Sequence, residues 1–200
     1  MDANENRRRA KMNLDDFFGK LLSLISRHPP ETLSYSKISR WTGVSRTTLY
    51  YYFGSSLEGM LKEAAAFGAK TFVQMTIVKD YKRFPNYGAF QNFIVSQSHL
   101  LMNERPWAAS LYLRYRGDKS YFGDAIREVE AAYFKEQIAA WKHFHKTEPD
   151  EYRIRFVSYI KIGVLYGLTA DPEIWFGEGK SARREKMSAT VARLAESLLK

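Results

Sequence analysis

Apolar residues recur at steps of three and four through most of the chain, and no stretch sustains the alternation of a strand. Proline and glycine interrupt this pattern at residues 29–30, 84–88, 171–172 and 177–179. We therefore predict an all-α fold of about nine helices. The expected spans are residues 13–27, 35–42, 46–52, 56–80, 88–103, 106–116, 120–145, 150–170 and 181–199.

Charge and composition narrow the class of protein. The 200 residues carry a net charge of +9, which favours a polyanionic partner. There is no cysteine, which excludes a disulfide scaffold, a Cys-ligated zinc site and a thiol nucleophile, and fits a reducing cytoplasm. The start is polar, and the longest apolar run is far shorter than the roughly 20 residues of a membrane span. We expect a cytoplasmic protein with no membrane partner.

Residues 35–53 have the pattern of two short helices joined by a tight turn. Ser39 is small where the helices would cross, Gly43 can adopt the positive φ of the turn, and Leu49 can fill the crossing from below. Ile38 and Val44 would complete a small core. The spacing predicts a helix-turn-helix.

Capping residues support these helices. Ser34 and Ser45 are expected N-caps of the two short helices, and Gly54 suits the position after the second. Ser55 with Glu58 has the spacing of a capping box that would open the next helix.

The second short helix would present hydroxyls, phenols and a guanidinium that can donate to phosphates and base edges. These groups belong to Ser45, Arg46, Thr47, Thr48, Tyr50, Tyr51 and Tyr52. Residues 27–55 contain four basic side chains and one acidic one, a net charge of +3. The aromatic rings could instead pack within the protein. For Tyr52 and Phe53 packing is at least as well favoured as contact with DNA, whereas for Tyr50 and Tyr51 contact with DNA is favoured.

These residues resemble the amino-terminal signature of the TetR family of bacterial regulators. The resemblance covers residues 33–61, about a quarter of the chain, and is clearest at residues 43–45 and 48–53. It implies DNA contacts at Thr47, Thr48, Tyr50, Tyr51 and Tyr52, and phosphate contacts where the preceding helix opens. We add neighbouring polar residues, so the remaining candidates are Tyr35, Ser36, Lys37, Ser45, Arg46 and Ser56. Ser56 stands where the family usually has lysine, Thr47 where a small residue is frequent, and Ser39 where alanine is usual.

The domain division follows from this assignment. We expect a DNA-binding domain over residues 1–54 and a ligand-binding and dimerisation domain over 55–200, linked by the helix at 56–80. Residues 1–12 would form a flexible basic arm containing Arg7, Arg8, Arg9 and Lys11. A solvated tail is the commoner outcome for such a segment, and insertion into a minor groove is the alternative.

The second domain is rich in aromatic residues, most of which must form its core. It shows no Gly-rich phosphate loop and no catalytic constellation. His143 and His145 are two residues apart, so one helix cannot aim both at one metal ion. We therefore expect no enzyme activity, metal or cofactor. The resemblance implies a small-molecule effector, for which the candidate contacts are His99, Trp107, Tyr112 and Arg114.

The helix expected at 150–170 is apolar around nearly its whole circumference, which requires burial on two sides. A second copy of the chain would cover one side, and a central helix in a monomer is the alternative. The expected dimerisation residues are Ile160, Gly163, Val164, Gly167, Val191, Leu194 and Leu198.

The favoured interpretation is a ligand-responsive homodimeric repressor that binds a pseudo-palindromic operator in double-stranded DNA. One alternative is a transcriptional activator or coactivator that acts through a protein partner, which the Ser56 departure keeps open. An alternative of another class is a small helical enzyme.

Overall fold

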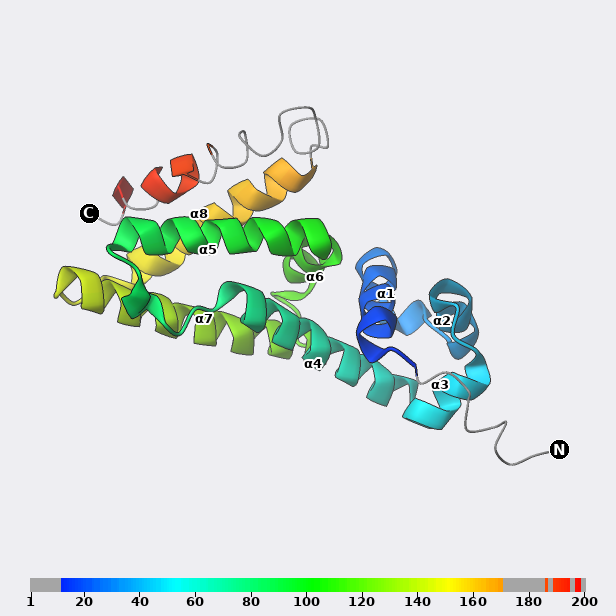
Figure 1. Ribbon diagram of the computed structural model, residues 1–200. Helices are drawn as coiled ribbons and strands as arrows, with labels where there is room; N and C mark the ends of the chain where they lie inside the picture. The colour runs from blue at the N-terminus through cyan, green and yellow to red at the C-terminus, as the bar shows by residue number, and fades with distance from the viewer. Residues whose placement is uncertain (1–11, 171–185, 187–188, 195–196, 199–200) are drawn as a thin grey trace. The chain divides into compact units, whose positions relative to one another are not determined.

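The computed structural model describes residues 12–170, 186, 189–194 and 197–198, except the side chains at 73–76 and 165–170. All regular secondary structure in this part of the chain is helical (Figure 1), which confirms the all-α prediction. The α-helices are α1 (Leu14–Arg27), α2 (Tyr35–Thr42), α3 (Arg46–Phe53), α4 (Leu57–Thr76), α5 (Tyr87–Glu104), α6 (Trp107–Tyr115), α7 (Tyr121–His145) and α8 (Glu151–Ala170). Two 3-10 turns, η2 (Pro30–Thr32) and η3 (Tyr81–Arg83), lie between them. The described residues of the expected span 181–199 are helical as well.

The helix expected at 56–80 is four residues too long in the prediction, because α4 ends at Thr76. Packing explains the early end. Val78, Tyr81 and Phe84 all pack against the core of the second half of the chain. A helix continued to residue 80 would turn some of these side chains away, so burial overrides the helical pattern.

The chain divides by its internal contacts into an amino-terminal unit, residues 1–68, and a carboxy-terminal unit, residues 69–200. The first turns of α4 therefore group with the helix-turn-helix, whereas we placed the functional boundary at residue 54. In the amino-terminal unit, α1 buries one apolar face that includes Phe17, Leu21 and Ile25. Ile38 of α2 and Leu49 of α3 are completely buried, as the sequence predicted.

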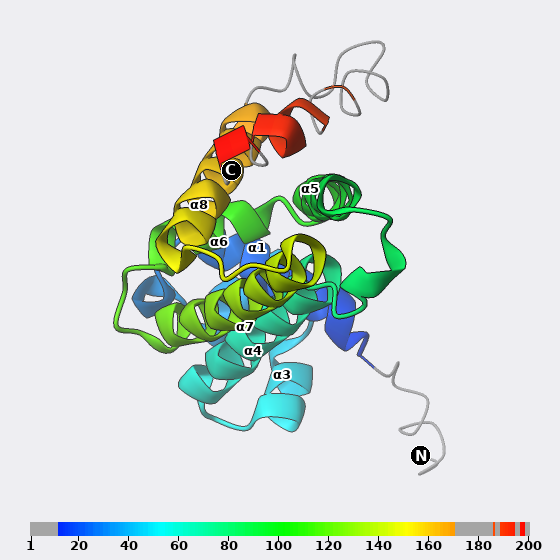
Figure 2. The same ribbon diagram turned by 90° about the vertical axis from the view of Figure 1, so that its left-hand side faces the viewer.

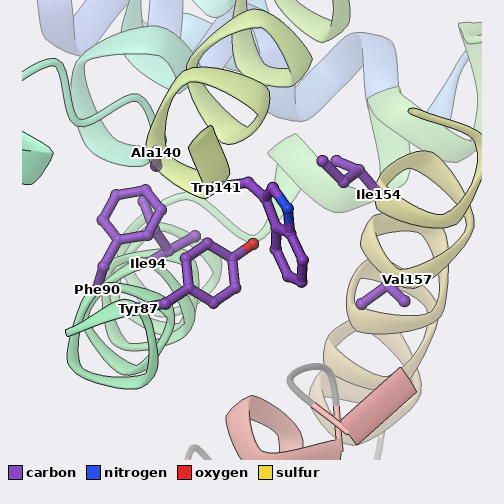
Figure 3. Packing of buried hydrophobic residues seen from close by; sticks show 7 residues of the cluster. All are labelled: Tyr87, Phe90, Ile94, Ala140, Trp141, Ile154 and Val157. Atoms are coloured by element: carbon purple, nitrogen blue, oxygen red, sulfur yellow. The ribbon is translucent and has the colours of Figure 1, made fainter. Parts of the chain in front are cut away.

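The carboxy-terminal unit is built on α5, α7 and α8, which pack against one another, with α6 between α5 and α7 (Figures 1 and 2). Its main core cluster consists of Tyr87, Phe90, Ile94, Ala140, Trp141, Ile154 and Val157. Figure 3 shows the indole of Trp141 lying between the ring of Tyr87 and the side chains of α8. No helix in the described residues is both long enough and apolar enough to cross a bilayer.

Candidate nucleic-acid interface

Short-range capping bonds fix the two helices of the helix-turn-helix. The Ser34 side chain accepts from the Lys37 N–H, and the Ser45 side chain accepts from the Thr48 N–H. Gly43 follows α2 at φ +77°, a left-handed conformation that a residue with a Cβ adopts only under strain. These bonds confirm both predicted N-caps and the role of the turn glycine, and they set where α3 begins.

Tyr35 anchors the far end of α3. Its side chain is buried, its hydroxyl donates to the carbonyl of Gly54 at 2.8 Å, and its ring stacks on Tyr50 with centroids 4.4 Å apart. Burial, followed by the charge of Tyr50, raises the pKa of the Tyr35 phenol. The hydroxyl already has a protein partner, so Tyr35 is placed to hold α3 against α2.

The outward face of α3 is rich in polar groups. Arg46 and Thr47 are exposed, and Tyr51 is 84% exposed, the highest value among the large apolar residues that are exposed in the described chain. Tyr50 is 48% exposed despite its stacking on Tyr35. Thr48 is half-buried, and its hydroxyl lies 2.8 Å from that of Ser45. Arg46, Thr47 and Tyr51 are therefore exposed to another molecule, and Tyr50 is exposed in part.

Arg46 also connects the two helices. Its guanidinium donates to the hydroxyl of Ser36 on α2 at 3.4 Å. Ser36 is exposed and Lys37 is half-buried, so α2 presents a hydroxyl and an ammonium near the start of α3. The structure thus brings these predicted residues to one surface.

The end of α3 makes different contacts. The Tyr52 hydroxyl accepts a hydrogen bond from the backbone N–H of Met12 at 3.3 Å, and Phe53 stacks on Phe17 of α1 with centroids 5.3 Å apart. Packing is therefore the main role of Phe53, while Tyr52 remains 38% exposed. The basic side chains at residues 7–9 and 11 lie outside the described residues.

Ser56, and not Ser55, caps α4. The Ser56 hydroxyl accepts from the Gly59 N–H at 3.0 Å, and its carbonyl accepts from Met60. Glu58 forms an ion pair with Lys62 at 2.7 Å, which lowers its pKa, so the capping box predicted for Ser55 and Glu58 is wrong. In this bond the Ser56 hydroxyl acts as an acceptor, so the bond does not use its proton.

The candidate effector contacts in the carboxy-terminal unit differ in their exposure. His99, Trp107 and Tyr112 are buried, whereas Arg114 is exposed with its guanidinium over the ring of Tyr115. The basic group that joins Tyr112 is Arg116. Glu130 accepts hydrogen bonds from the Tyr112 hydroxyl and from Arg116 Nε, and Arg116 also donates to the Tyr159 hydroxyl. Burial, followed by the bond to Glu130, raises the pKa of Tyr112, and the bond to Glu130 raises that of Arg116.

A second buried polar group lies in the carboxy-terminal unit, and it was not predicted from the sequence. Lys161 of α8 donates to the side-chain oxygen of Gln91 on α5 at 2.7 Å and to the hydroxyl of Tyr133 on α7 at 3.3 Å. The Gln91 amide donates in turn to Gln137 of α7 at 2.8 Å. A lysine within an otherwise apolar helix face, and glutamines within two others, were the signals available in the sequence.

An apolar row is exposed on α8. Tyr152, Phe156, Ile160 and Val164 follow one another at steps of four, and only Ile160 is half-buried. Gly163 is exposed beside them, and the exposure of Gly167 lies outside the described residues. Near the carboxyl end, Val191 is buried, whereas Leu194 and Leu198 are exposed. We call Tyr152, Phe156, Ile160 and Val164 the α8 row.

Among the described residues, no group of three or more His, Asp or Glu side chains is placed to hold a metal ion. Trp141 stacks on His145 with centroids 3.9 Å apart, and His143 lies against Tyr81 and Phe144. Both histidines are therefore part of the aromatic packing at the end of α7.

Comparison of the sequence with known protein families and with curated proteins gives no match. Comparison of the fold does. A TetR-family transcriptional regulator from Streptomyces coelicolor superposes with a TM-score of 0.65 and 17% identity, over 99% of this chain and 82% of that one. The fatty acid degradation regulator FadR from Bacillus halodurans gives 0.67 and 15%, over 92% and 97%. FadR from Bacillus subtilis, solved in complex with stearoyl-CoA, gives 0.63 and 16%, over 94% and 100%.

Proposed function

We propose that this chain, which has the fold of TetR-family transcriptional regulators, is a DNA-binding regulator of transcription. The observation that carries the proposal is the outward face of α3, where Arg46, Thr47 and Tyr51 are exposed while Leu49 locks the opposite face into the core. A helix held in this way can enter a major groove and offer donors to base edges and phosphates.

The contacts divide into two kinds. Thr47 and Tyr51, with Thr48 and Tyr50 beside them, would read base edges. Arg46, Lys37, Ser36, Ser45 and Ser56 would bind phosphates, aided by the N–H groups at the starts of α3 and α4. Tyr52 lies at the rim of this surface, and Tyr35 supports α3 from behind. The basic segment at residues 1–11 would add minor-groove or phosphate contacts.

The regulator would act as a homodimer. The α8 row is an apolar ridge at steps of four, the spacing that packs into the groove of another helix. Leu194 and Leu198 repeat the same step near the carboxyl end. A second copy related by a twofold axis would cover both, and two α3 helices would then read half-sites about one helical turn apart in a pseudo-palindromic operator.

A small-molecule effector would set the activity. FadR from Bacillus subtilis was solved with stearoyl-CoA, and this likeness of fold supports a small-molecule ligand for this chain, which we place in the carboxy-terminal unit. His99, Trp107 and Tyr112 are buried and would meet such a ligand inside this unit, whereas Arg114 is exposed and would reach it only from the surface. The effector regulates DNA binding only if it binds one conformation of the dimer more tightly than the other.

Repression is the favoured direction of regulation, because a dimer bound across a promoter blocks it without further partners. Activation or coactivation through a protein partner is the second candidate, and the observation behind it is that Ser56 offers no positive charge at the start of α4. Action on DNA agrees with the cytoplasmic location expected from the sequence.

The test is specific binding to the DNA that flanks the gene, measured by gel shift with competitor DNA present. The variant Thr47→Ala/Tyr51→Ala should weaken specific binding by at least about tenfold, because base-edge contacts contribute roughly 1–3 kcal/mol each. Its salt dependence should not change, since neither side chain neutralises a phosphate. Arg46→Ala should instead reduce the salt slope by about one.

Thr32→Ala is the matched control for Thr47, because Thr32 is an exposed threonine of the same unit outside α3. Its binding should equal that of the unmodified protein. Equal binding by the α3 double variant, with its fold intact by circular dichroism, would refute the proposed interface. A protein with no specific site in its flanking DNA would contradict the repressor assignment.

A further inference from the structure

We propose that Lys161 is the cationic anchor of a ligand site inside the carboxy-terminal unit, and that this site takes a monoanion with an apolar body. This inference rests on the proposed function, because it names the chemical class of the effector. Its basis is a buried ammonium that meets amide and phenol oxygens but no carboxylate in the described part of the chain.

The position of Lys161 is unusual for a lysine. The residue is only 4% exposed, and its ammonium lies among three helices, with Gln91 from α5 and Tyr133 from α7 as partners. Lysine is almost never buried to this degree unless it is paired. A polar core contact needs no charge, so an amide or hydroxyl at this position would satisfy the same partners at lower cost.

No carboxylate among the described residues pairs with Lys161, whose ammonium lies 6.0 Å from the centre of the Tyr133 ring. Every ion pair in that part of the chain joins other side chains, and Glu130, which lies seven residues before Gln137 on α7, is already bound by Arg116. Burying one member of an ion pair alone is costly, because the lost hydration is not replaced. An anionic ligand would supply the missing partner.

The hydrogen bonds leave room for that partner. An ammonium has three N–H donors, and two are used, by Gln91 and Tyr133. Gln137 accepts from the amide nitrogen of Gln91, which orients the Gln91 oxygen toward Lys161. The third N–H has no acceptor in the described residues, and a carboxylate or sulfonate oxygen would complete the set.

Apolar residues flank this polar group. Lys161 follows Val157 by one turn of α8, and Gln137 precedes Ala140 and Trp141 on α7; all three of these apolar residues belong to the cluster in Figure 3. One turn after Gln91 on α5 is Val95, which belongs to a second buried cluster with Met102, Ala109 and Val191. Such surroundings suit an apolar body, and a single uncompensated cation suits a single negative charge.

The experiment uses two dyes that share an anilinonaphthalene body. One, 8-anilinonaphthalene-1-sulfonate, is anionic, and the other, N-phenyl-1-naphthylamine, lacks the sulfonate. Fluorescence titration of the full chain should show saturable binding of the anionic dye. Lys161→Met keeps the length of the side chain and removes its charge. This variant should lower the affinity for the anionic dye by at least about tenfold, because hydrogen bonds to charged groups are among the strongest. Its affinity for the neutral dye should not change.

A second variant keeps the lysine. Gln91→Glu places a carboxylate at the oxygen that already accepts from Lys161, so the ammonium would be paired within the protein. This variant should also lose the binding of the anionic dye. Lys135→Met, at an exposed position of α7, is the matched control and should bind both dyes as the unmodified protein does.

Equal binding of the anionic dye by the unmodified protein, Lys161→Met and Gln91→Glu would overturn the proposal, as would absence of saturable binding. A parallel loss of both dyes in Lys161→Met with retention of the anionic dye in Gln91→Glu would overturn it too. DNA binding without dye separates this inference from the proposed function. Both variants should still bind DNA, and a protein that binds the anionic dye through Lys161 but no DNA would refute only the proposed function.

Discussion

Tyr112 is a residue whose burial and hydrogen bonding make the protonation of its phenol differ between the folded and the unfolded chain. Its hydroxyl donates to Glu130 of α7, which also accepts a hydrogen bond from Arg116, the residue that follows α6. Burial and the neighbouring carboxylate both oppose the phenolate, so the pKa of Tyr112 lies above its ordinary value of 10.0. The folded protein therefore keeps this proton at pH values where the unfolded chain releases it.

The stability of the protein should fall in alkali because of Tyr112. Above about pH 10 the unfolded chain loses the proton and the folded chain retains it, so each further pH unit costs up to about 1.4 kcal/mol. Tyr112→Phe removes this term. The free energy of unfolding, measured in urea between about pH 9 and 11.5, should then fall less steeply than in the unmodified protein.

Tyr152→Phe is the control for this measurement, because it makes the same substitution at a tyrosine that is 75% exposed. The same steep alkaline slope in Tyr112→Phe would contradict the assignment of the raised pKa to this phenol.

At the scale of the element, the ends of the helices are decided by single hydroxyls. Ser34, Ser45 and Ser56 each accept a backbone N–H from the first turn of the helix that follows. These bonds satisfy donors that no helical carbonyl can reach. The starts of α2, α3 and α4, and with them the polar surface around α3, depend on these caps.

Ser56→Ala should destabilise the protein by about 1 kcal/mol, the usual cost of an N-cap that is lost. Ser55→Ala should change stability by a few tenths at most, because Ser55 is an exposed neighbour outside the cap. Urea unfolding of the two variants compares them directly. A larger loss in Ser55→Ala than in Ser56→Ala would show that the cap lies at Ser55 in solution.

Local rules predicted most of the fold. The helical pattern, the caps at Ser34 and Ser45 and the turn at Gly43 depend on residues within four positions of one another, so the sequence contains them directly. At α4 the same rules predicted the wrong one of two neighbouring serines, because the spacing of Ser55 and Glu58 fits a capping box while the structure has the cap at Ser56. The end of α4 at Thr76 likewise depends on where Val78 and Tyr81 are buried.

The candidate sites were predictable to different extents. The exposed face of α3 follows from the position of Leu49, one residue that must point inward. The buried polar groups do not, because Lys161 meets a partner 70 residues away and Arg116 meets Tyr159, 43 residues away. Arg114 and Arg116 differ by two positions on the chain, and only the helix packing shows which of them reaches Tyr112.

At the scale of the whole molecule, the α8 row is an apolar surface that stays largely exposed among the described residues. Tyr152 and Phe156 stack with their ring planes 7° apart, and both are largely exposed. Exposed rings arranged in this way are typical of an interface between copies. Specific binding to a two-part operator would depend on this surface as well as on α3.

Phe156→Lys should convert the proposed dimer to a monomer at micromolar concentration, because a charge within an apolar interface is costly and buried aromatic residues contribute most to binding. Light scattering after gel filtration measures the mass. The loss of the dimer should also lower the affinity for a complete operator, although the contacts that each α3 makes with DNA stay intact.

Leu113→Lys is a matched control, since Leu113 on α6 and Phe156 on α8 are both 49% exposed. This variant should remain dimeric. A Phe156→Lys protein that stays dimeric, or an unmodified protein that is monomeric under the same conditions, would contradict the role given to α8.

The hydrogen bonds among Gln91, Gln137 and Lys161 also fix how the helices that they join are aligned along their axes. Apolar contacts have no preferred direction, so by themselves they define the alignment of α8 with its neighbours less strictly than hydrogen bonds do. A slip of α8 by a turn would separate Lys161 from Gln91 and leave several polar groups without partners, at a cost of roughly 1–3 kcal/mol each. This group of hydrogen bonds among three helices thus favours the one alignment of α5, α7 and α8 in which all of these polar side chains are paired.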